Sequence, residues 1–141
     1  MNVDATDFDV LYDFGTERVE DVMALFADTD WAAHRTREDI VHMMANTQVL
    51  VGLQPAGSDS FVGFARALSD GRYKAVIEDV VVAAGVRNLG VGHVLMAAVM
   101  AHPVVATVEE VELYCHPDRL RFYRDAGFSV VDDQLFMRHV N

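Results

Sequence analysis

The sequence predicts a single α/β (α+β) domain over residues 1–141: a mixed, mostly antiparallel central sheet of about seven strands, with helices on both faces. Its 141 residues are 52% hydrophobic, which suits one ordinary domain with one core. Segments with strand and helix patterns follow one another without a repeat or an interdomain linker. Three consecutive strand patterns in the middle are joined only by short turns, as in a meander of antiparallel strands.

The first elements are a strand and two helices. Residues Asp9–Phe14 alternate and can start a sheet. Thr16 is predicted as the N-cap of an amphipathic helix, and Thr36 as the N-cap of a second, shorter one. The apolar positions of the two helices are Val19, Val22, Met23 and Phe26, and then Ile40, Val41, Met43 and Met44.

Three strands follow. Thr47–Leu53 and Phe61–Leu68 are joined by a turn containing proline and glycine, and Asp70-Gly71 makes a tight turn into Tyr73–Val82. The apolar run Val80-Val81-Val82 does not alternate, which predicts a central strand covered on both faces.

The last part of the chain alternates between helices and strands. A glycine-rich turn at residues 86–93 opens a helix that runs to about His102, and a strand is predicted at Val111–Cys115. Pro117 suits the first turn of another helix, which ends at Gly127. Phe128–Val131 and Gln134–Val140 are predicted as a final pair of strands.

The charge balance excludes several classes of protein. Asp and Glu number 22 against 11 basic residues, a net charge of -11, so nothing in the chain would neutralise a run of nucleic-acid phosphates. No apolar stretch reaches the roughly 18 residues of a membrane span, and the acidic N-terminus does not resemble a secretory signal. We therefore expect a cytoplasmic protein without membrane or nucleic-acid partners. The acidity also suggests a salt-loving source, with an ordinary acidic protein as the alternative.

Metal or disulfide chemistry is not expected. Cys115 is the only cysteine, and the six histidines are scattered without metal-ligand spacing. We interpret Cys115 as a small core residue rather than a nucleophile.

Two motifs carry a family resemblance. Arg87-x-x-Gly90-x-Gly92 directly follows the Val80–Val82 run, and resembles the acetyl-CoA signature of GNAT acetyltransferases. Phe122-Tyr123-Arg124-Asp125-Ala126-Gly127-Phe128 resembles their second landmark. The element order matches that fold along nearly the whole chain. The resemblance implies a GNAT-type acetyl-CoA-dependent N-acetyltransferase, an acyltransferase that uses acetyl-CoA as co-substrate and no metal.

The resemblance also implies which residues meet the cofactor. The physical argument agrees, because a helix N-terminus offers unpaired N–H groups to a pyrophosphate and glycine lets the backbone approach closely. The expected cofactor-binding residues are Val80, Val81, Val82, Arg87, Asn88, Leu89, Gly90, Val91, Gly92, His93, His116 and Arg119.

A narrower likeness concerns glucosamine-6-phosphate N-acetyltransferases. Ile77-Glu78-Asp79-Val80-Val81-Val82 and Leu113-x-Cys115 look like their corresponding strands. His116 departs from their acidic residue, and Arg119 and Ala84 depart from a usual small residue and a usual proline. These departures put a sugar substrate in doubt more than the fold or the cofactor.

Two residues are the candidate catalysts. Tyr123 can protonate the departing coenzyme A thiolate, because a phenol is still protonated at neutral pH; the alternative is a core tyrosine beside Phe122. Glu78 is the candidate base that takes the amine proton, and it is expected to share a face with Val80 and Val82. Asp79 and bulk water remain open as the base, and an ion pair of Glu78 with Arg66 or Arg72 is the structural alternative.

The acceptor is predicted to be a small-molecule or peptide amine. Trp31, Arg35, Arg66 and Asp79 are the candidate substrate residues, and two arginines would suit an acceptor that carries a carboxylate or phosphate. The alternatives are that Trp31 covers the core and that the arginines pair with some of the many surface acids. The expected reaction is direct attack of a primary amine on acetyl-CoA in a ternary complex. The alternative is a non-catalytic acyl-CoA-binding sensor or interaction module. A homodimer is left open.

Overall fold

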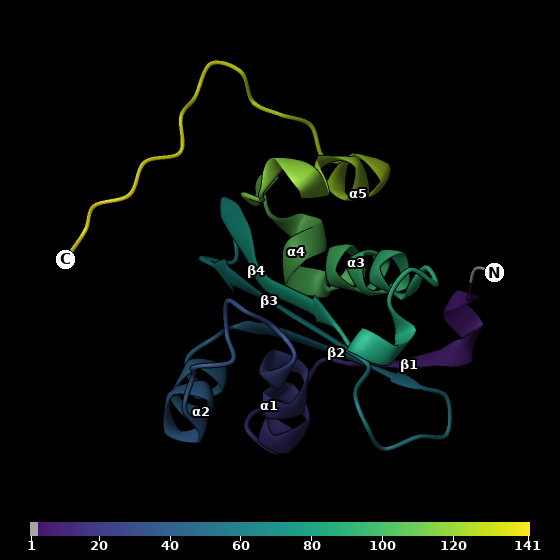
Figure 1. Ribbon diagram of the computed structural model, residues 1–141. Coiled ribbons are helices and arrows are strands. Elements are labelled where there is room, and N and C mark those ends of the chain that lie inside the picture. The colour runs from purple at the N-terminus through teal and green to yellow at the C-terminus, as the bar shows by residue number, and fades with distance from the viewer. Residues whose placement is uncertain (1–2) are drawn as a thin grey trace.

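A five-stranded sheet with the order β1-β2-β3-β4-β5 forms the centre of the computed structural model, which describes residues 3–141 (Figure 1). Its first four strands pair antiparallel to one another: β1 (Phe8–Leu11), β2 (Val49–Pro55), β3 (Gly63–Ser69) and β4 (Lys74–Val82). The short β5 (Glu110–Glu112) runs parallel to β4. The predicted mixed, mostly antiparallel sheet is confirmed, with five strands among residues 3–141 instead of seven.

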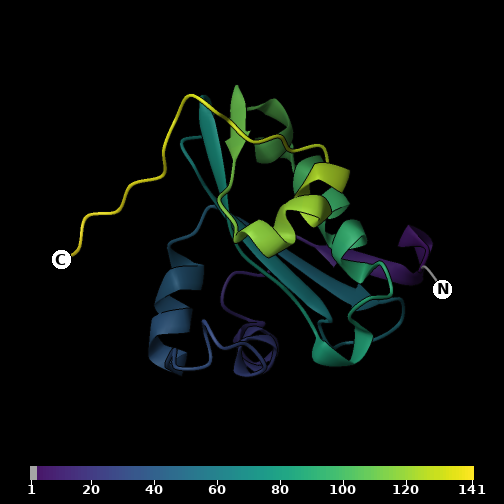
Figure 2. The same ribbon diagram turned by 45° about the horizontal axis from the view of Figure 1, so that its top comes forward.

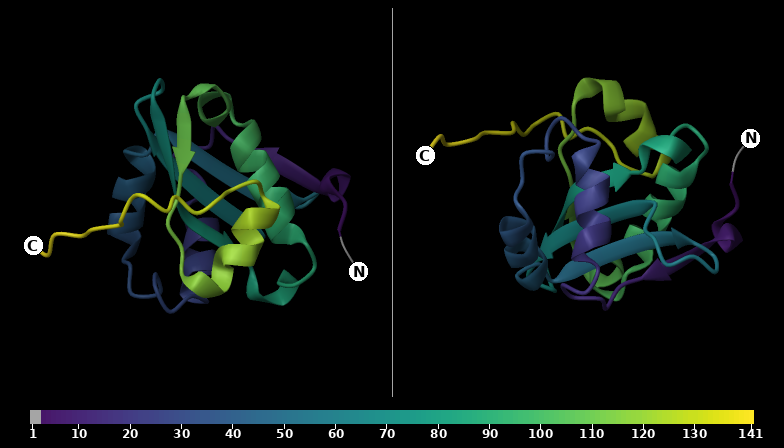
Figure 3. Two further views of the ribbon diagram at one scale, coloured as in Figure 1. Left: turned by 90° about the horizontal axis from the view of Figure 1, so that it is seen from above. Right: turned by 60° about the horizontal axis from the view of Figure 1, so that its bottom comes forward.

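Helices cover both faces of this sheet. On one face lie α1 (Val19–Ala27) and α2 (Arg37–Ala45), and on the other lie α3 (Val91–Ala101) and α4 (Pro103–Thr107), with α5 (Leu120–Asp125) beside them (Figures 1 and 3). The short helix α4 was not expected from the sequence. No helix within residues 3–141 has both the length and the apolar character needed to cross a membrane.

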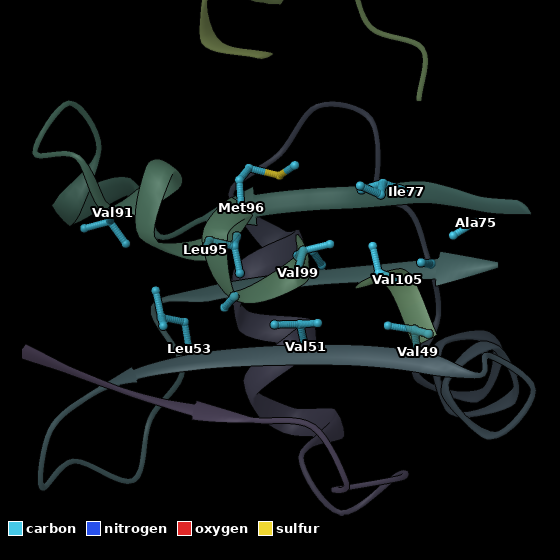
Figure 4. Packing of buried hydrophobic residues seen from close by; sticks show 13 residues of the cluster. Val49, Val51, Leu53, Ala75, Ile77, Val91, Leu95, Met96, Val99 and Val105 are labelled. Atoms are coloured by element: carbon cyan, nitrogen blue, oxygen red, sulfur yellow. The ribbon is translucent and has the colours of Figure 1, made fainter. Parts of the chain in front are cut away.

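The sheet separates two clusters of buried side chains. Val49, Val51 and Leu53 of β2 meet the apolar side of α3 in the first cluster (Figure 4). Leu50 of β2 and Phe64 of β3 meet α1 and α2 in the second. Because successive strand residues point to opposite faces, a central strand that serves both clusters is apolar at nearly every position. This explains the unbroken hydrophobic run of β2.

The two predicted N-caps have different outcomes. The Thr36 hydroxyl accepts a hydrogen bond from the Asp39 backbone N–H at 3.2 Å, so Thr36 caps α2 as predicted. The Thr16 prediction is wrong, because α1 begins at Val19 with Arg18 at the cap position. Residues 15–18 form a turn first, and the Val19 N–H donates to the Thr16 carbonyl rather than to its side chain.

The two strands predicted after α5 are absent. Gly127 ends the helix region as expected, with a φ of +97°, but residues 128–141 then run along the surface without a ladder partner. Leu135 and Met137 are 87% and 85% exposed. The apolar run Leu135-Phe136-Met137 suits a strand, but a strand also needs a neighbouring edge and a buried face. Neither is present for these residues.

Strands β4 and β5 stay together over only a short length. Their parallel pairing ends at Val76 and Glu112, although β4 continues for six more residues, to Val82. Beyond this point the backbone of β4 is free on that edge. The residues gathered around this opening form the candidate site.

Candidate active site

A bulge in β4 decides which side chains face the site. Arg66 pairs with Glu78 and Phe64 pairs with Val81, so two steps along β3 match three along β4. The extra residue lies around Asp79, whose φ of +56° is in the left-handed region. The alternation of side chains between the two faces of the sheet is therefore shifted by one residue beyond this point.

This shift corrects one prediction. Val80 and Val82 pack against the α3 cluster, whereas Glu78 lies opposite Arg66, which lines a cavity against α2. Directly paired strand residues share a face, so Glu78 is on the α1/α2 side and does not share a face with Val80 and Val82. The prediction assumed strict alternation, which an inserted residue breaks.

Asp79 is the centre of a buried ion cluster. Its carboxylate accepts hydrogen bonds from Arg35 Nη1 and Nη2 at 2.9 and 3.2 Å, and from Arg66 Nε at 2.6 Å. The Asp79 side chain is only 6% exposed. Burial alone would raise the pKa of this carboxyl, but the hydrogen bonds from Arg35 and Arg66 outweigh it and lower the pKa below its ordinary value of 3.8. Asp79 is therefore a charged anchor for both arginines.

The predicted substrate residues come together around this anchor. Arg35 and Arg66 line a cavity of about 290 Å³ with Asp39, Ile40 and Met43 of α2. Trp31 lies next to Arg35, whose guanidinium carbon is 5.6 Å from the centre of the indole ring. The cavity thus combines two guanidinium groups, an apolar wall and an exposed carboxylate.

Glu78 has a partner that the sequence reasoning missed. The Tyr114 hydroxyl donates a hydrogen bond to Glu78 Oε1 at 3.1 Å, and this bond raises the pKa of Tyr114. The predicted alternative, an ion pair of Glu78 with Arg66 or Arg72, is not formed among the described residues, and Arg66 binds Asp79 instead. No local pattern marks Tyr114. Only the parallel register of Val76 with Glu112 brings residues 78 and 114 near one another.

The start of α3 has the features of an anion site. Gly90 is the N-cap residue with a φ of +89°, and the neighbouring Asn88 also has a positive φ of +65°. Helices α1 and α2 carry acidic residues in their first turns, but α3 carries none. In a chain of charge -11, this first turn carries no carboxylate of its own beside its unpaired N–H groups. Arg87 lies just before it and donates from Nε to the Val82 carbonyl at 3.1 Å.

Gly92 has a structural reason of its own. A Cβ at this position would be 2.8 Å from Cε1 of Phe122, so the ring of α5 occupies the space. The two sequence motifs are therefore packed directly against each other. His93 stacks at a tilt on the same ring, with centroids 4.9 Å apart. It also lines a second cavity, of about 280 Å³, between α3 and α5.

Tyr123 lies on α5 within the α3 cluster, edge-on to Phe122 and Phe128. Burial raises the pKa of its hydroxyl, and the nearby Cys115 raises it further. The interpretation of Cys115 as a core residue is wrong, because it is exposed just beyond β5. His116 and Arg119 are also exposed, in the turn that leads into α5.

Metal ligands are not gathered anywhere in residues 3–141: the structure has no group of three or more His, Cys, Asp or Glu side chains that could hold an ion there.

Known proteins share this fold. The family model described as an acetyltransferase (GNAT) domain matches residues 13–141. This chain belongs to the GNAT acetyltransferase family. It is 33% identical over 104 residues to serotonin N-acetyltransferase 2, chloroplastic, of Oryza sativa subsp. japonica, covering 72% of this chain and 52% of that one. It is 39% identical over 71 residues to the uncharacterized N-acetyltransferase ycf52 of Porphyra purpurea, covering 50% and 41%.

Solved structures agree with this membership. A crystal structure from Xanthomonas campestris pv. campestris, described as belonging to the GNAT family, is 28% identical with a TM-score of 0.77, covering 94% of this chain and 93% of that one. Glucosamine-6-phosphate N-acetyltransferase of Arabidopsis thaliana has a TM-score of 0.69 at 17% identity, covering 93% and 97%. That likeness is one of fold alone. This GNAT chain spans about half the length of the curated relatives it matches.

Proposed function

We propose that this protein transfers the acetyl group of acetyl-CoA to a primary amine by direct attack in a ternary complex. The observation that carries the proposal is the start of α3. It is a helix N-terminus opened by a left-handed glycine and free of acidic residues, and it follows the strand that parts from β5. Such a terminus suits the pyrophosphate of coenzyme A. Membership of the GNAT family supports the same cofactor.

The residues around this terminus would hold the cofactor. Backbone N–H groups of residues 89–92 would bind the pyrophosphate, and the Arg87 guanidinium adds a positive charge beside them. Because β4 has no partner beyond Val76 on its β5 edge, the N–H groups that point to that edge, up to Val82, would bind the pantetheine and polarise the thioester carbonyl. When bound, acetyl-CoA supplies an activated acetyl group and a thiolate leaving group.

Proton transfer would fall to two side chains. Glu78 would take a proton from the ammonium of the acceptor, and Tyr123 would return one to the departing sulfur. Burial keeps the Tyr123 hydroxyl protonated at neutral pH because it raises the pKa. Glu78→Gln should lower turnover most at low pH, where the amine most needs deprotonation. An unchanged pH–rate profile would indicate that Asp79 or water, and not Glu78, is the base.

The acceptor would bind on the α1/α2 side, next to Glu78. The cavity of about 290 Å³ lined by Arg35 and Arg66 is the size of a small amine or a single peptide side chain. The guanidinium groups would suit an acceptor with a carboxylate or phosphate, although Asp79 already balances part of their charge. The rice relative is named for serotonin, so arylalkylamines are a second acceptor class to test.

Binding and turnover separate the proposal from a non-catalytic acyl-CoA sensor. Acetyl-CoA should bind the wild type in calorimetry, and an amine panel assayed by thiol release should then show turnover. Gly90→Asp should abolish binding because it puts a carboxylate against the pyrophosphate. Gly90→Asn is the matched control, since Asn has nearly the same shape, tolerates a positive φ and carries no charge. If the two variants bind acetyl-CoA with equal affinity, the assignment of this helix start as the cofactor site is wrong. If the wild type binds acetyl-CoA but acetylates no amine of the panel, the result favours the non-catalytic sensor.

A further inference from the structure

We propose that Tyr114 is a positioning residue for Glu78, and that Phe136 of the C-terminal segment (residues 128–141) holds Tyr114 in place. The proposal rests on the function proposed above, because it concerns the candidate base of that reaction. It assigns a role to a segment that belongs to no helix or strand.

Three successive side-chain contacts support the proposal. The Tyr114 hydroxyl donates to Glu78 Oε1 at 3.1 Å. The rings of Tyr114 and Phe136 are stacked, with centroids 4.3 Å apart and planes inclined by 30°. The Arg138 guanidinium also lies over the Phe136 ring, 5.0 Å from its centre. A chain of side chains thus runs from the C-terminal segment to the candidate base.

The path of the segment agrees with these contacts. After α5 the chain turns back and passes across β5 before it leaves the body of the protein (Figure 2; Figure 3, left). The two sequence neighbours of Phe136, Leu135 and Met137, are 87% and 85% exposed, whereas Phe136 is 58% exposed and stacks on Tyr114. Phe136 is therefore the residue through which this segment contacts Tyr114.

Tyr114 needs such support to act on Glu78. It follows the end of β5, where no ladder fixes the backbone, and it is 51% exposed. A half-exposed tyrosine can adopt several rotamers, and a stacked partner reduces that freedom. With Oε1 occupied by the phenol, Glu78 directs Oε2 to the acceptor. One proton then passes from the ammonium nitrogen to Oε2, leaving a neutral amine and a neutral carboxyl.

The charged groups around Glu78 come from three parts of the chain. Arg66 is its cross-strand neighbour on β3, Asp79 is adjacent on β4, and Arg138 acts on Tyr114 from the C-terminal segment. Arg66 is engaged by Asp79, so Tyr114 is the hydrogen-bond donor that the structure gives to Glu78. Removing that donor frees the carboxylate to rotate.

Steady-state kinetics over a pH series test the role in the reaction. Tyr114→Phe and Phe136→Ala should each lower kcat up to about tenfold, equivalent to about 1.4 kcal/mol. The pH–rate profile should differ from that of the wild type, whereas the KM for acetyl-CoA should stay the same. Phe136→Tyr should restore kcat because it keeps the stacked ring. The matched controls are Met137→Ala for the segment and the exposed Tyr73→Phe for loss of a phenol; both should behave as wild type.

A second measurement does not depend on turnover. With ¹³Cζ-labelled tyrosine, assigned by the loss of one signal in Tyr114→Phe, NMR should show the pKa of Tyr114 falling in Glu78→Gln and in Phe136→Ala, but not in Met137→Ala. An unchanged titration in Phe136→Ala, or kinetics equal to the Met137→Ala control, would overturn the proposal. If the wild type acetylates no amine, the proposed function fails, and the NMR titration still decides whether Phe136 holds Tyr114 on Glu78.

Discussion

Replacing Asp79 with Asn should destabilise the protein by about 2–3 kcal/mol. The carboxylate accepts three hydrogen bonds from Arg35 and Arg66 and is 6% exposed. Removing one partner of a buried ion pair typically costs about 3–5 kcal/mol, because the other charge is left uncompensated. The two arginine side chains are 29% and 15% exposed, so water can solvate part of their charge. Asn also keeps one carbonyl acceptor, which places the expected cost below that range.

The assay is chemical denaturation at pH 7 together with a thermal melt. At roughly 3 °C per kcal/mol for a domain of this size, the midpoint should fall by about 6–9 °C. Asp39→Asn is the matched control, because it removes an exposed carboxylate from the same cavity. Its free energy of unfolding should stay within about 0.5 kcal/mol of the wild-type value. Equal stabilities of the two variants would refute the argument that Asp79 anchors the arginines.

The pH dependence gives an independent check. An aspartate whose pKa is lowered in the fold contributes stability that is complete above the unfolded value, near 3.8, and is lost as the pH falls through the lowered folded value. The difference between wild type and Asp79→Asn should therefore be constant from pH 7 to about 5 and shrink only below 3.8. A difference that grows with acid would contradict stabilisation of the ionised carboxylate by the two arginines.

Further predictions concern the cofactor side of the protein and its charge. Gly92→Ala should destabilise by about 1 kcal/mol in denaturation, because overpacking against Phe122 exceeds the gain in helix propensity; a more stable variant would contradict this. Tyr123→Phe should lower kcat by about 10²-fold with acetyl-CoA affinity nearly unchanged, whereas a purely structural tyrosine would lose only about 1 kcal/mol of stability. The melting temperature should rise between low and molar potassium chloride, because screening relieves repulsion among 22 acidic residues; a flat or falling value would count against adaptation to salt.

The sequence predicts this fold well where periodic burial decides the structure. The runs of β2 and β4 and the apolar faces of α1 and α3 are read directly from the positions of apolar residues. The prediction fails where the structure of a segment depends on contacts with a segment far away in the sequence. Residues 134–140 contain the apolar run Leu135-Phe136-Met137, which suits a strand, yet β5 has only three residues and its ladder ends at Glu112. The residue type of Cys115 favours burial, whereas its position beyond the end of that short strand exposes it.

The candidate site shows the same limit at the level of single residues. The sequence predicts a shared pocket for Arg35, Arg66 and Asp79, and they do lie together, but it could not show that Asp79 binds both arginines. The bulge could not be predicted from the sequence, because Asp tolerates a positive φ without requiring one. Ala75 and Ile77 lie in the α3 cluster, so Glu78 faces the arginine cavity, and the inserted residue turns Val80 and Val82 to the α3 side instead of the side of Glu78. The strand therefore presents its candidate base to one face and Val80 and Val82 to the other. A change that flattened the bulge would disrupt this division, even if every side chain of the site were kept.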